Sequence, residues 1–227
     1  MAILCRNHNL LFIMTPRTGC TAIGEMLCNE LGGEYLPAED ILNDEGNIVV
    51  QKKHSTVRQL LDCDLLDRAT CDSLLKFTAV RNPFDSFVSL YVKKSSRSEE
   101  LLGDPESFVH RMPQYKEDVY YCATHSFDEW IANRFAVSRL ERLFRKGRRS
   151  LFDRYTEGVD CVMRFENLQE DFDRLLHQAG VGKKLDIPRI NPTTSRNDNY
   201  REYYSPESRA IIEYAFASDL KKYGYAF

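Results

Sequence analysis

The stretch LLFIMTPRTGCT, residues 10–21, decides how this chain is expected to fold. Its apolar run Leu10–Met14 predicts a buried strand, and the turn after it leads into an amphipathic segment that ends at Gly32-Gly33. The apolar residues of that segment recur at helical spacing: Ile23, Met26, Leu27 and Leu31. A strand, a turn and a helix in this order are typical of an α/β domain.

The turn Thr15–Thr21 has the composition of an anion-binding loop. A turn between a strand and a helix directs several backbone N–H groups to one point, at the positive end of the helix dipole. Gly19 allows a ligand to approach the backbone, and Arg17 supplies a permanent charge. Thr18 and Thr21 supply hydroxyls. The alternative is an ordinary connection that carries a surface arginine.

A nucleotide kinase is a poor interpretation of this turn. Gly19 and Gly24 have the spacing of a Walker A loop, but Glu25-Met26 follows where Lys-Ser/Thr is required. Without that lysine on the phosphates and that hydroxyl on Mg²⁺, the chemistry is missing. Gly24 also falls inside the expected helix.

A second turn, Arg81-Asn82-Pro83, repeats the arrangement after an apolar run at 77–80. The helix expected after it has an apolar face at Phe84, Phe87, Val88, Tyr91 and Val92. Arg81 and Ser89, the latter expected on the polar flank of this helix, could together hold a phosphate, although a capped helix with an incidental arginine is an equal alternative. Two anion turns at the carboxyl edge of one parallel sheet suit a nucleoside with phosphates at both ends.

The remaining pattern predicts one α/β domain over residues 1–227, with a central, mostly parallel sheet flanked by helices. Further strands are expected at 48–50 and 159–165. Helix starts are expected at Ser55, which would cap a helix through Leu61, at Asn167 with Glu170 in a capping box before Gly180, and at Ser205-Pro206.

Composition excludes several classes of function. The net charge is −3 with a sequence pI of about 6.0, which gives no support to a nucleic-acid partner. No apolar stretch approaches the roughly 20 residues of a membrane span, and no signal-peptide pattern is present, so a cytoplasmic protein without a membrane partner is expected. The seven scattered cysteines predict reduced thiols and no metal site.

These residues resemble the sulfotransferase superfamily. Thr15–Thr21 is similar to its 5′-phosphosulfate loop, and Arg81–Tyr91 matches its 3′-phosphate motif Arg-x-Pro-x-x-x-x-x-Ser-x-Tyr at each fixed position. The branch is similar to the carbohydrate-type, bacterial "family 2" enzymes, through Lys53-His54-Ser55-Thr56, the segment 164–168 and the tyrosine-rich ending 200–225. The resemblance implies a P-loop-like fold and 3′-phosphoadenosine-5′-phosphosulfate (PAPS) as co-substrate, with PAP as product and no metal.

The resemblance also implies roles for individual residues. Arg17 stands where the family usually has lysine, so it is expected to stabilise charge and not to donate a proton. Cys20 would contribute its backbone N–H. His54, which follows the 48–50 strand, is the candidate base. Arg196 and Tyr200 would lie in a loop that closes over the nucleotide, with an ordinary solvated loop as the alternative.

The acceptor is expected to be a saccharide or a small metabolite with a hydroxyl, or in second place an amine. The basic run Arg139–Arg149 is expected to be a solvated helix face, with a dock for an anionic acceptor as the alternative. A rival from another class is a non-catalytic PAP-binding protein that keeps the fold.

Overall fold

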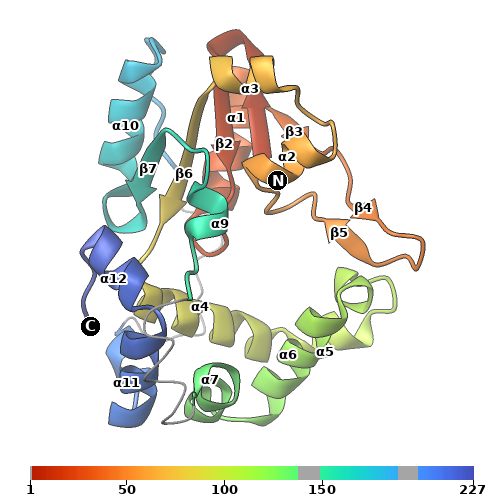
Figure 1. Cartoon of the computed structure of the whole chain (residues 1–227), viewed down its shortest axis with the longest axis vertical. Coiled ribbons are helices and arrows are strands. Elements are labelled where there is room, and N and C mark those ends of the chain that lie inside the picture. The colour runs from red at the N-terminus through yellow and green to blue at the C-terminus, as the bar shows by residue number, and fades with distance from the viewer. Residues whose placement is uncertain (1, 138–148, 189–198) are drawn as a thin grey trace. The chain divides into compact units, whose positions relative to one another are not determined.

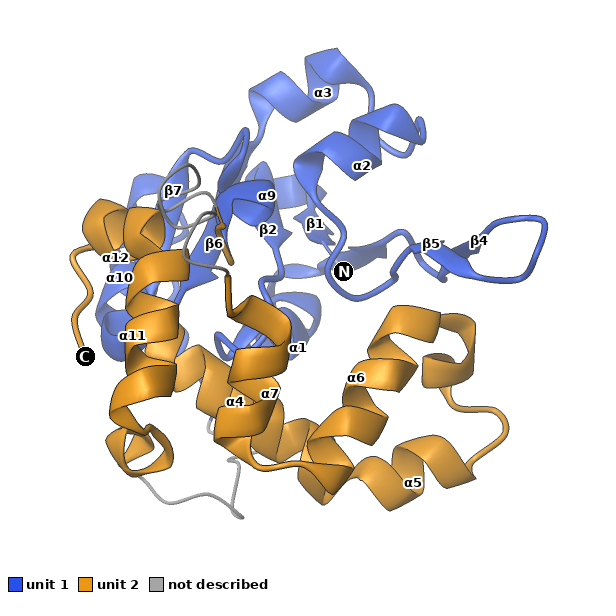
Figure 2. Ribbon diagram, turned by 60° about the horizontal axis from the view of Figure 1, so that its bottom comes forward, with its two compact units in different colours: residues 1–81, 152–192 blue, residues 82–151, 193–227 orange. Residues whose placement is uncertain are grey.

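A computed structural model describes residues 2–137, 149–188 and 199–227. The chain divides into two compact units: residues 1–81 with 152–192 form unit 1, and residues 82–151 with 193–227 form unit 2 (Figure 2). Unit 1 contains the sheet, and unit 2 is helical. The single domain over residues 1–227 stays a prediction.

Unit 1 is built on a five-stranded sheet in the order β3-β1-β2-β6-β7 (Figure 1). The strands are β1 (Ala2–Cys5), β2 (Leu10–Ile13), β3 (Glu34–Leu36), β6 (Leu75–Val80) and β7 (Cys161–Arg164). β1 is antiparallel to both of its neighbours, whereas β2, β6 and β7 pair in parallel. Four of the five strands therefore run in one direction, which confirms the mostly parallel sheet.

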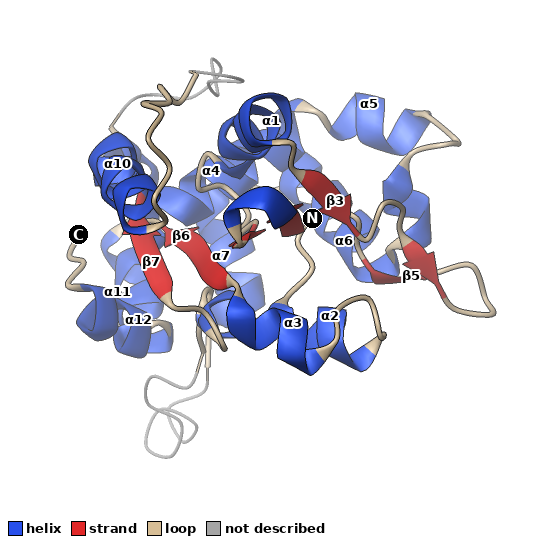
Figure 3. Cartoon of the chain, turned by 90° about the horizontal axis from the view of Figure 1, so that it is seen from above, coloured by secondary structure: helices blue, strands red, loops and turns tan. Residues whose placement is uncertain are grey.

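Both faces of this sheet are covered by helices of unit 1 (Figure 3). Alternate residues point to opposite faces because the side-chain period of a strand is two. Phe12 and Phe77 therefore face α1 (Cys20–Leu31) and α10 (Leu168–Gln178), while Leu11 and Ile13 face α2 (Val57–Asp62) and α3 (Arg68–Ser73). The structure confirms the predicted α/β class, in which helices flank a central sheet.

Several expected elements of unit 1 differ from the structure. β1 was not predicted, and β5 (Ile48–Val50) pairs only with β4 (Ile41–Leu42) in a separate hairpin, so the expected central strand at 48–50 is wrong. Thr56, not Ser55, caps α2, through a capping box with Gln59. Asn167 precedes α10 but makes no side-chain cap, because a 3-10 helix at Phe165–Asn167 already continues into it.

Unit 2 is a group of helices around an aromatic core. Its helices are α4 (Pro83–Ser96), α5 (Ser98–Gly103), α6 (Pro113–Thr124), α7 (Phe127–Phe135), α11 (Pro206–Ala215) and α12 (Ala217–Tyr223). The predicted apolar face of α4 is confirmed, since Phe84, Phe87 and Val88 pack with Trp130. Ser205 caps α11 with Pro206 at its first position, as expected.

Candidate functional site

The candidate site lies in unit 1, at the carboxyl ends of β2 and β6. The chain passes from β2 through α1 to β3 on one side of β2, whereas β6 lies on the other side. The direction of the connections therefore reverses between β2 and β6. Ligands of open α/β sheets bind beyond the carboxyl ends of the strands at such a reversal. The Thr15 turn follows β2 and Arg81 follows β6, so both predicted anion turns begin here.

The Thr15 turn is held by its own hydroxyls. Thr18 Oγ1 donates to the carbonyl of Thr15 over 2.9 Å, and Thr15 Oγ1 lies 2.7 Å from Thr78 Oγ1. Thr78 in turn donates to the carbonyl of Ile13 over 2.7 Å. All three threonines are buried. The Thr18 hydroxyl therefore donates its proton within the turn. The sequence analysis had instead expected this hydroxyl to contact the ligand.

The backbone of this turn leads directly into the start of α1. Arg17 and Gly19 have φ of +66° and +74°, and Gly19 is the N-cap without a side-chain cap bond. Cys20 and Thr21 are the first two residues of the helix, so their N–H groups lie at the positive end of the helix dipole. Cys20 is buried, with 5% of its surface exposed. A strand, a turn and a helix start in this order have the geometry of many anion sites, and anion binding by this turn stays a prediction.

Arg81 joins the two turns. Its side chain is only 7% exposed, and Nη1 donates to the carbonyl of Arg17 over 2.9 Å. The guanidinium carbon lies 4.1 Å from the centre of the Phe165 ring, a cation–π distance. The turns that follow β2 and β6 are thus in direct contact. The Arg81 side chain and the backbone of Arg17 therefore belong to one cluster.

His54 lies beside the same turn. Its Nδ1 is 2.7 Å from the carbonyl oxygen of Met14, the residue that precedes Thr15. Its φ is +76°, and among the residues that the structure describes only four that are not glycine have a positive φ. Two of those four are Arg17 and His54. Such backbone conformations cost free energy, and they gather at functional sites.

The other predicted site residues belong to unit 2 or lie outside the described residues. Ser89 and Tyr200 belong to unit 2, where Ser89 is 1% exposed and not on the expected polar flank of α4. The Tyr200 hydroxyl accepts a bond of 3.4 Å from Asn82 Nδ2, which also donates to the carbonyl of Ala226. Arg196 lies outside the described residues. So does most of the Arg139–Arg149 run, of which Arg149 donates to the carbonyl of Arg134.

A model of the sulfotransferase family matches residues 1–226. The chain belongs to the sulfotransferase family. This confirms the family and its predicted "family 2" branch, and with them the transfer of a sulfuryl group as the general activity. No curated protein and no solved structure matches the chain.

Three residues of this sulfotransferase site were missed from the sequence: Met14, Thr78 and Phe165. Met14 acts through its carbonyl, which no sequence pattern reveals. Thr78 carried a signal, because it is a threonine inside an otherwise apolar run that aligns with Ile13 of β2. Phe165 lies in the family-like segment 164–168, but its place under Arg81 depends on the pairing of β6 with β7.

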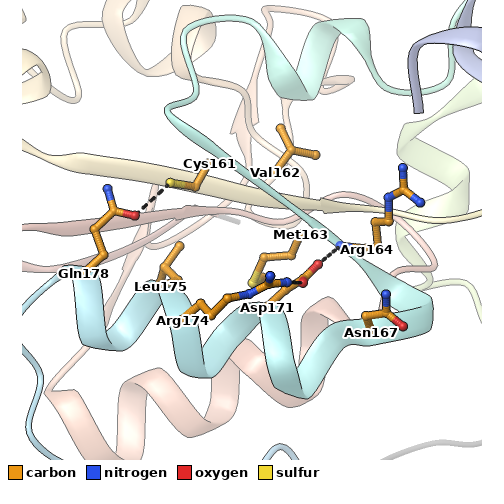
Figure 4. Close-up of a pocket in the computed structure, with 9 residues that line it drawn as sticks. All are labelled: Cys161, Val162, Met163, Arg164, Asn167, Asp171, Arg174, Leu175 and Gln178. Atoms are coloured by element: carbon orange, nitrogen blue, oxygen red, sulfur yellow. Dashed lines mark hydrogen bonds and ion pairs between the residues drawn. The ribbon is translucent and has the colours of Figure 1, made fainter. Parts of the chain in front are cut away.

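A hollow of about 420 Å³ lies elsewhere in unit 1 of the sulfotransferase, between β7 and α10 (Figure 4). It contains none of the predicted site residues. Its polar groups already have partners, since Asp171 accepts from the Arg164 N–H over 2.7 Å and pairs with Arg174. Across the described ranges 2–137, 149–188 and 199–227, no group of three or more His, Cys, Asp or Glu side chains could hold a metal, and no helix could span a membrane.

Proposed function

We propose that this sulfotransferase transfers the sulfuryl group of PAPS to a hydroxyl, or in second place an amine, of a saccharide or small metabolite. The observation that carries the proposal is the bond of 2.9 Å between Arg81 Nη1 and the Arg17 carbonyl. It brings the turns that resemble the 5′-phosphosulfate and 3′-phosphate motifs within reach of one ligand. PAPS has anionic groups at both ends of its nucleoside, which suits two arginine-bearing turns.

Within this proposal the two turns hold different ends of the donor. The N–H groups at the start of α1, from Gly19, Cys20 and Thr21, bind the phosphosulfate together with Arg17. Arg81 binds the 3′-phosphate, with Ser89 of α4 as its partner in the motif. Arg196 and Tyr200 complete the nucleotide site by the resemblance alone.

The transfer is a single in-line displacement. The acceptor oxygen forms a bond to sulfur while the bond from sulfur to the bridging oxygen of the 5′-phosphate breaks, and its electrons stay on the departing PAP. Arg17 and the loop N–H groups face the oxygen where this charge develops, and preorganised donors at that point lower a barrier. His54 accepts the acceptor proton as general base.

A screen with ³⁵S-labelled PAPS against hydroxyl and amine acceptors tests the proposal. We expect transfer by the natural chain and loss of transfer in His54→Asn, because asparagine tolerates a positive φ but supplies no basic nitrogen. His177→Asn, which changes an exposed histidine of α10, is the matched control and should keep full activity.

PAP binding, measured by calorimetry, separates the two candidate functions. Binding of PAP without transfer to any acceptor would favour the non-catalytic PAP-binding protein. Full activity of His54→Asn would reject His54 as the base while leaving the donor proposal intact. Failure to bind PAP at all would overturn the proposed donor.

A further inference from the structure

The segment that carries His54 is tied to two strands of the central sheet by the side chain of Ser55. Ala2 of β1 aligns with Ile13 of β2 and with Leu36 of β3, so these residues form one row across the sheet. Ser55 Oγ accepts from the Ala2 N–H over 2.9 Å and donates to the Leu36 carbonyl over 3.0 Å. The Ser55 side chain therefore bridges the middle residue of this row, Ala2, and the residue at one end, Leu36.

Ser55 is fully buried, with 0% of its surface exposed. Thr56 already caps α2, so the hydroxyl of Ser55 has no part in starting that helix. A buried hydroxyl that both accepts and donates fixes the backbone next to it, because moving that backbone would leave the buried N–H of Ala2 and the half-buried carbonyl of Leu36 without this partner. The adjoining residue that is fixed in this way is His54.

The His54 ring is held from a second direction. The carbonyl oxygen of Met14 can only accept a hydrogen bond, so the contact of 2.7 Å requires a proton on Nδ1. In the neutral ring the lone pair then belongs to Nε2, the nitrogen that a general base must use here. The ring is carried by a backbone with φ of +76°, a conformation that is uncommon for residues other than glycine.

We propose that Ser55 is a positioning residue, which holds His54 in its left-handed backbone so that Nδ1–H stays on the Met14 carbonyl and Nε2 is the proton acceptor. The inference rests on the proposed role of His54 as base. Ser55 does not touch the substrates in this proposal. It acts through the tautomer and the direction of the neighbouring ring.

The first test uses the natural chain labelled with ¹⁵N-histidine, and long-range ¹⁵N–¹H NMR reads the tautomer of each ring. The His54 signals are assigned by their loss in His54→Asn. We expect His54 as the Nδ1–H tautomer at a pH where the ring is neutral. An Nε2–H tautomer would overturn the inference, whether or not the protein transfers sulfate, and no variant of Ser55 is needed for this result.

The second test compares Ser55→Ala with Ser73→Ala, which removes an exposed serine hydroxyl from α3 in the same unit. In Ser55→Ala we expect kcat to fall about 10- to 100-fold, as for small misplacements of a catalytic group. The KM for PAPS should change less than about twofold, because the Arg17–Arg81 contact is intact, and the His54 ring should show mixed tautomers. Ser73→Ala should match the natural chain in all three measurements.

The outcomes separate this inference from the proposed function. An unchanged kcat or an unchanged single tautomer in Ser55→Ala would overturn the positioning role while sulfuryl transfer stands. A rise in the KM for PAPS with kcat unchanged would also overturn it, since that result places Ser55 in donor binding. Absence of transfer by the natural chain would overturn the proposed function, and the tautomer measurements would then test the positioning of His54 without it.

Discussion

The two units treat their buried polar side chains differently. At the sheet edge of unit 1, Thr18, His54 and Arg81 bond to backbone carbonyls of the Met14–Arg17 segment. In unit 2, the buried Lys94 and Asp118 bond mainly to other side chains on neighbouring helices. Side chains that bond to the backbone shape a turn, whereas side chains that bond to each other dock rigid helices. The difference indicates that these bonds shape a turn in unit 1, whereas in unit 2 they join helices to one another.

The network of unit 2 centres on Asp118, which is 8% exposed. Its carboxylate pairs with Lys94 of α4 and accepts from Trp130 Nε1 and Arg134 Nη1 of α7, each over 2.8 Å. Burial alone would raise the pKa of Asp118, but Lys94, Trp130 and Arg134 together hold it below the ordinary value of a carboxyl group. The carboxylate is therefore ionised, and it links α4, α6 and α7.

Breaking this network gives the largest expected effect. Asp118→Ala leaves the buried ammonium of Lys94 without its partner, so we expect unit 2 to lose about 3–5 kcal/mol of unfolding free energy. Denaturant unfolding followed by the fluorescence of Trp130, the single tryptophan of the sequence, reports on this unit. Replacing both partners, Lys94→Met with Asp118→Leu, should cost much less. A loss below about 1 kcal/mol in Asp118→Ala would contradict the role given to the network.

In unit 1 the corresponding substitution is expected to lower the rate of sulfuryl transfer and to leave the free energy of unfolding unchanged. Arg17→Gly keeps the positive φ of the turn and removes the charge. We expect the single-turnover rate of sulfuryl transfer to fall about 10²–10³-fold, the usual effect of losing one donor to a developing oxyanion. Arg58→Ala, on the exposed face of α2, is the control. Equal rates in Arg17→Gly and the natural chain would exclude Arg17 from the reaction.

Two glycines of unit 1, Gly19 and Gly32, distinguish the effect of a positive φ from the effect of close packing. Gly19 and Gly32 have φ of +74° and +63°, so alanine at either position costs about 1–2 kcal/mol through the backbone alone. A Cβ on Gly19 would also lie 3.1 Å from Leu168 Cδ2 and 3.5 Å from Phe165 Cε2, whereas nothing lies within 4 Å at Gly32. Phe165 is the ring under Arg81, so Gly19→Ala should weaken PAP binding and Gly32→Ala should not.

Calorimetry with PAP and thermal unfolding of both variants measure this difference. Similar destabilisation with separate effects on PAP affinity is the expected pattern. If Gly32→Ala weakens PAP binding as much as Gly19→Ala does, the contact of Gly19 with Phe165 has no part in the site.

Local signals predicted the positions of the two turns better than the pairing of the strands. The turn after Leu10–Met14 and the start of α4 at Pro83 depend on a few adjacent residues, and both lie where they were expected. The short segment Ile48–Val50 also forms a strand as expected, but its partner is β4 and not the central sheet. Strand pairing joins distant residues, so a three-residue apolar run does not reveal which sheet it enters.

The place of His54 shows the same limit at the level of one residue. It was expected near the Thr15 turn because a central strand would lead to it, yet β5 lies in the hairpin. The ring reaches Met14 instead because Ser55 is bonded to Ala2 and Leu36, residues 53 and 19 positions away. A serine before an apolar helix predicts a helix N-cap. Only the fold shows that the Ser55 hydroxyl bonds to the sheet instead.

The smallest expected effect is that of breaking an exposed ion pair on the surface of unit 2. Arg209 Nε and Glu213 Oε1 lie 2.7 Å apart on α11, and their side chains are 47% and 42% exposed. Water screens this pair on both charges, so Glu213→Ala should cost no more than about 0.5 kcal/mol in the Trp130 unfolding assay. The pair has a hydrogen-bond distance like that of Asp118 with Trp130 or Arg134, so the two variants differ in burial and in the number of partners that are lost, three for Asp118 and one for Glu213. A cost for Glu213→Ala equal to that of Asp118→Ala would show that burial is not what gives the network its strength.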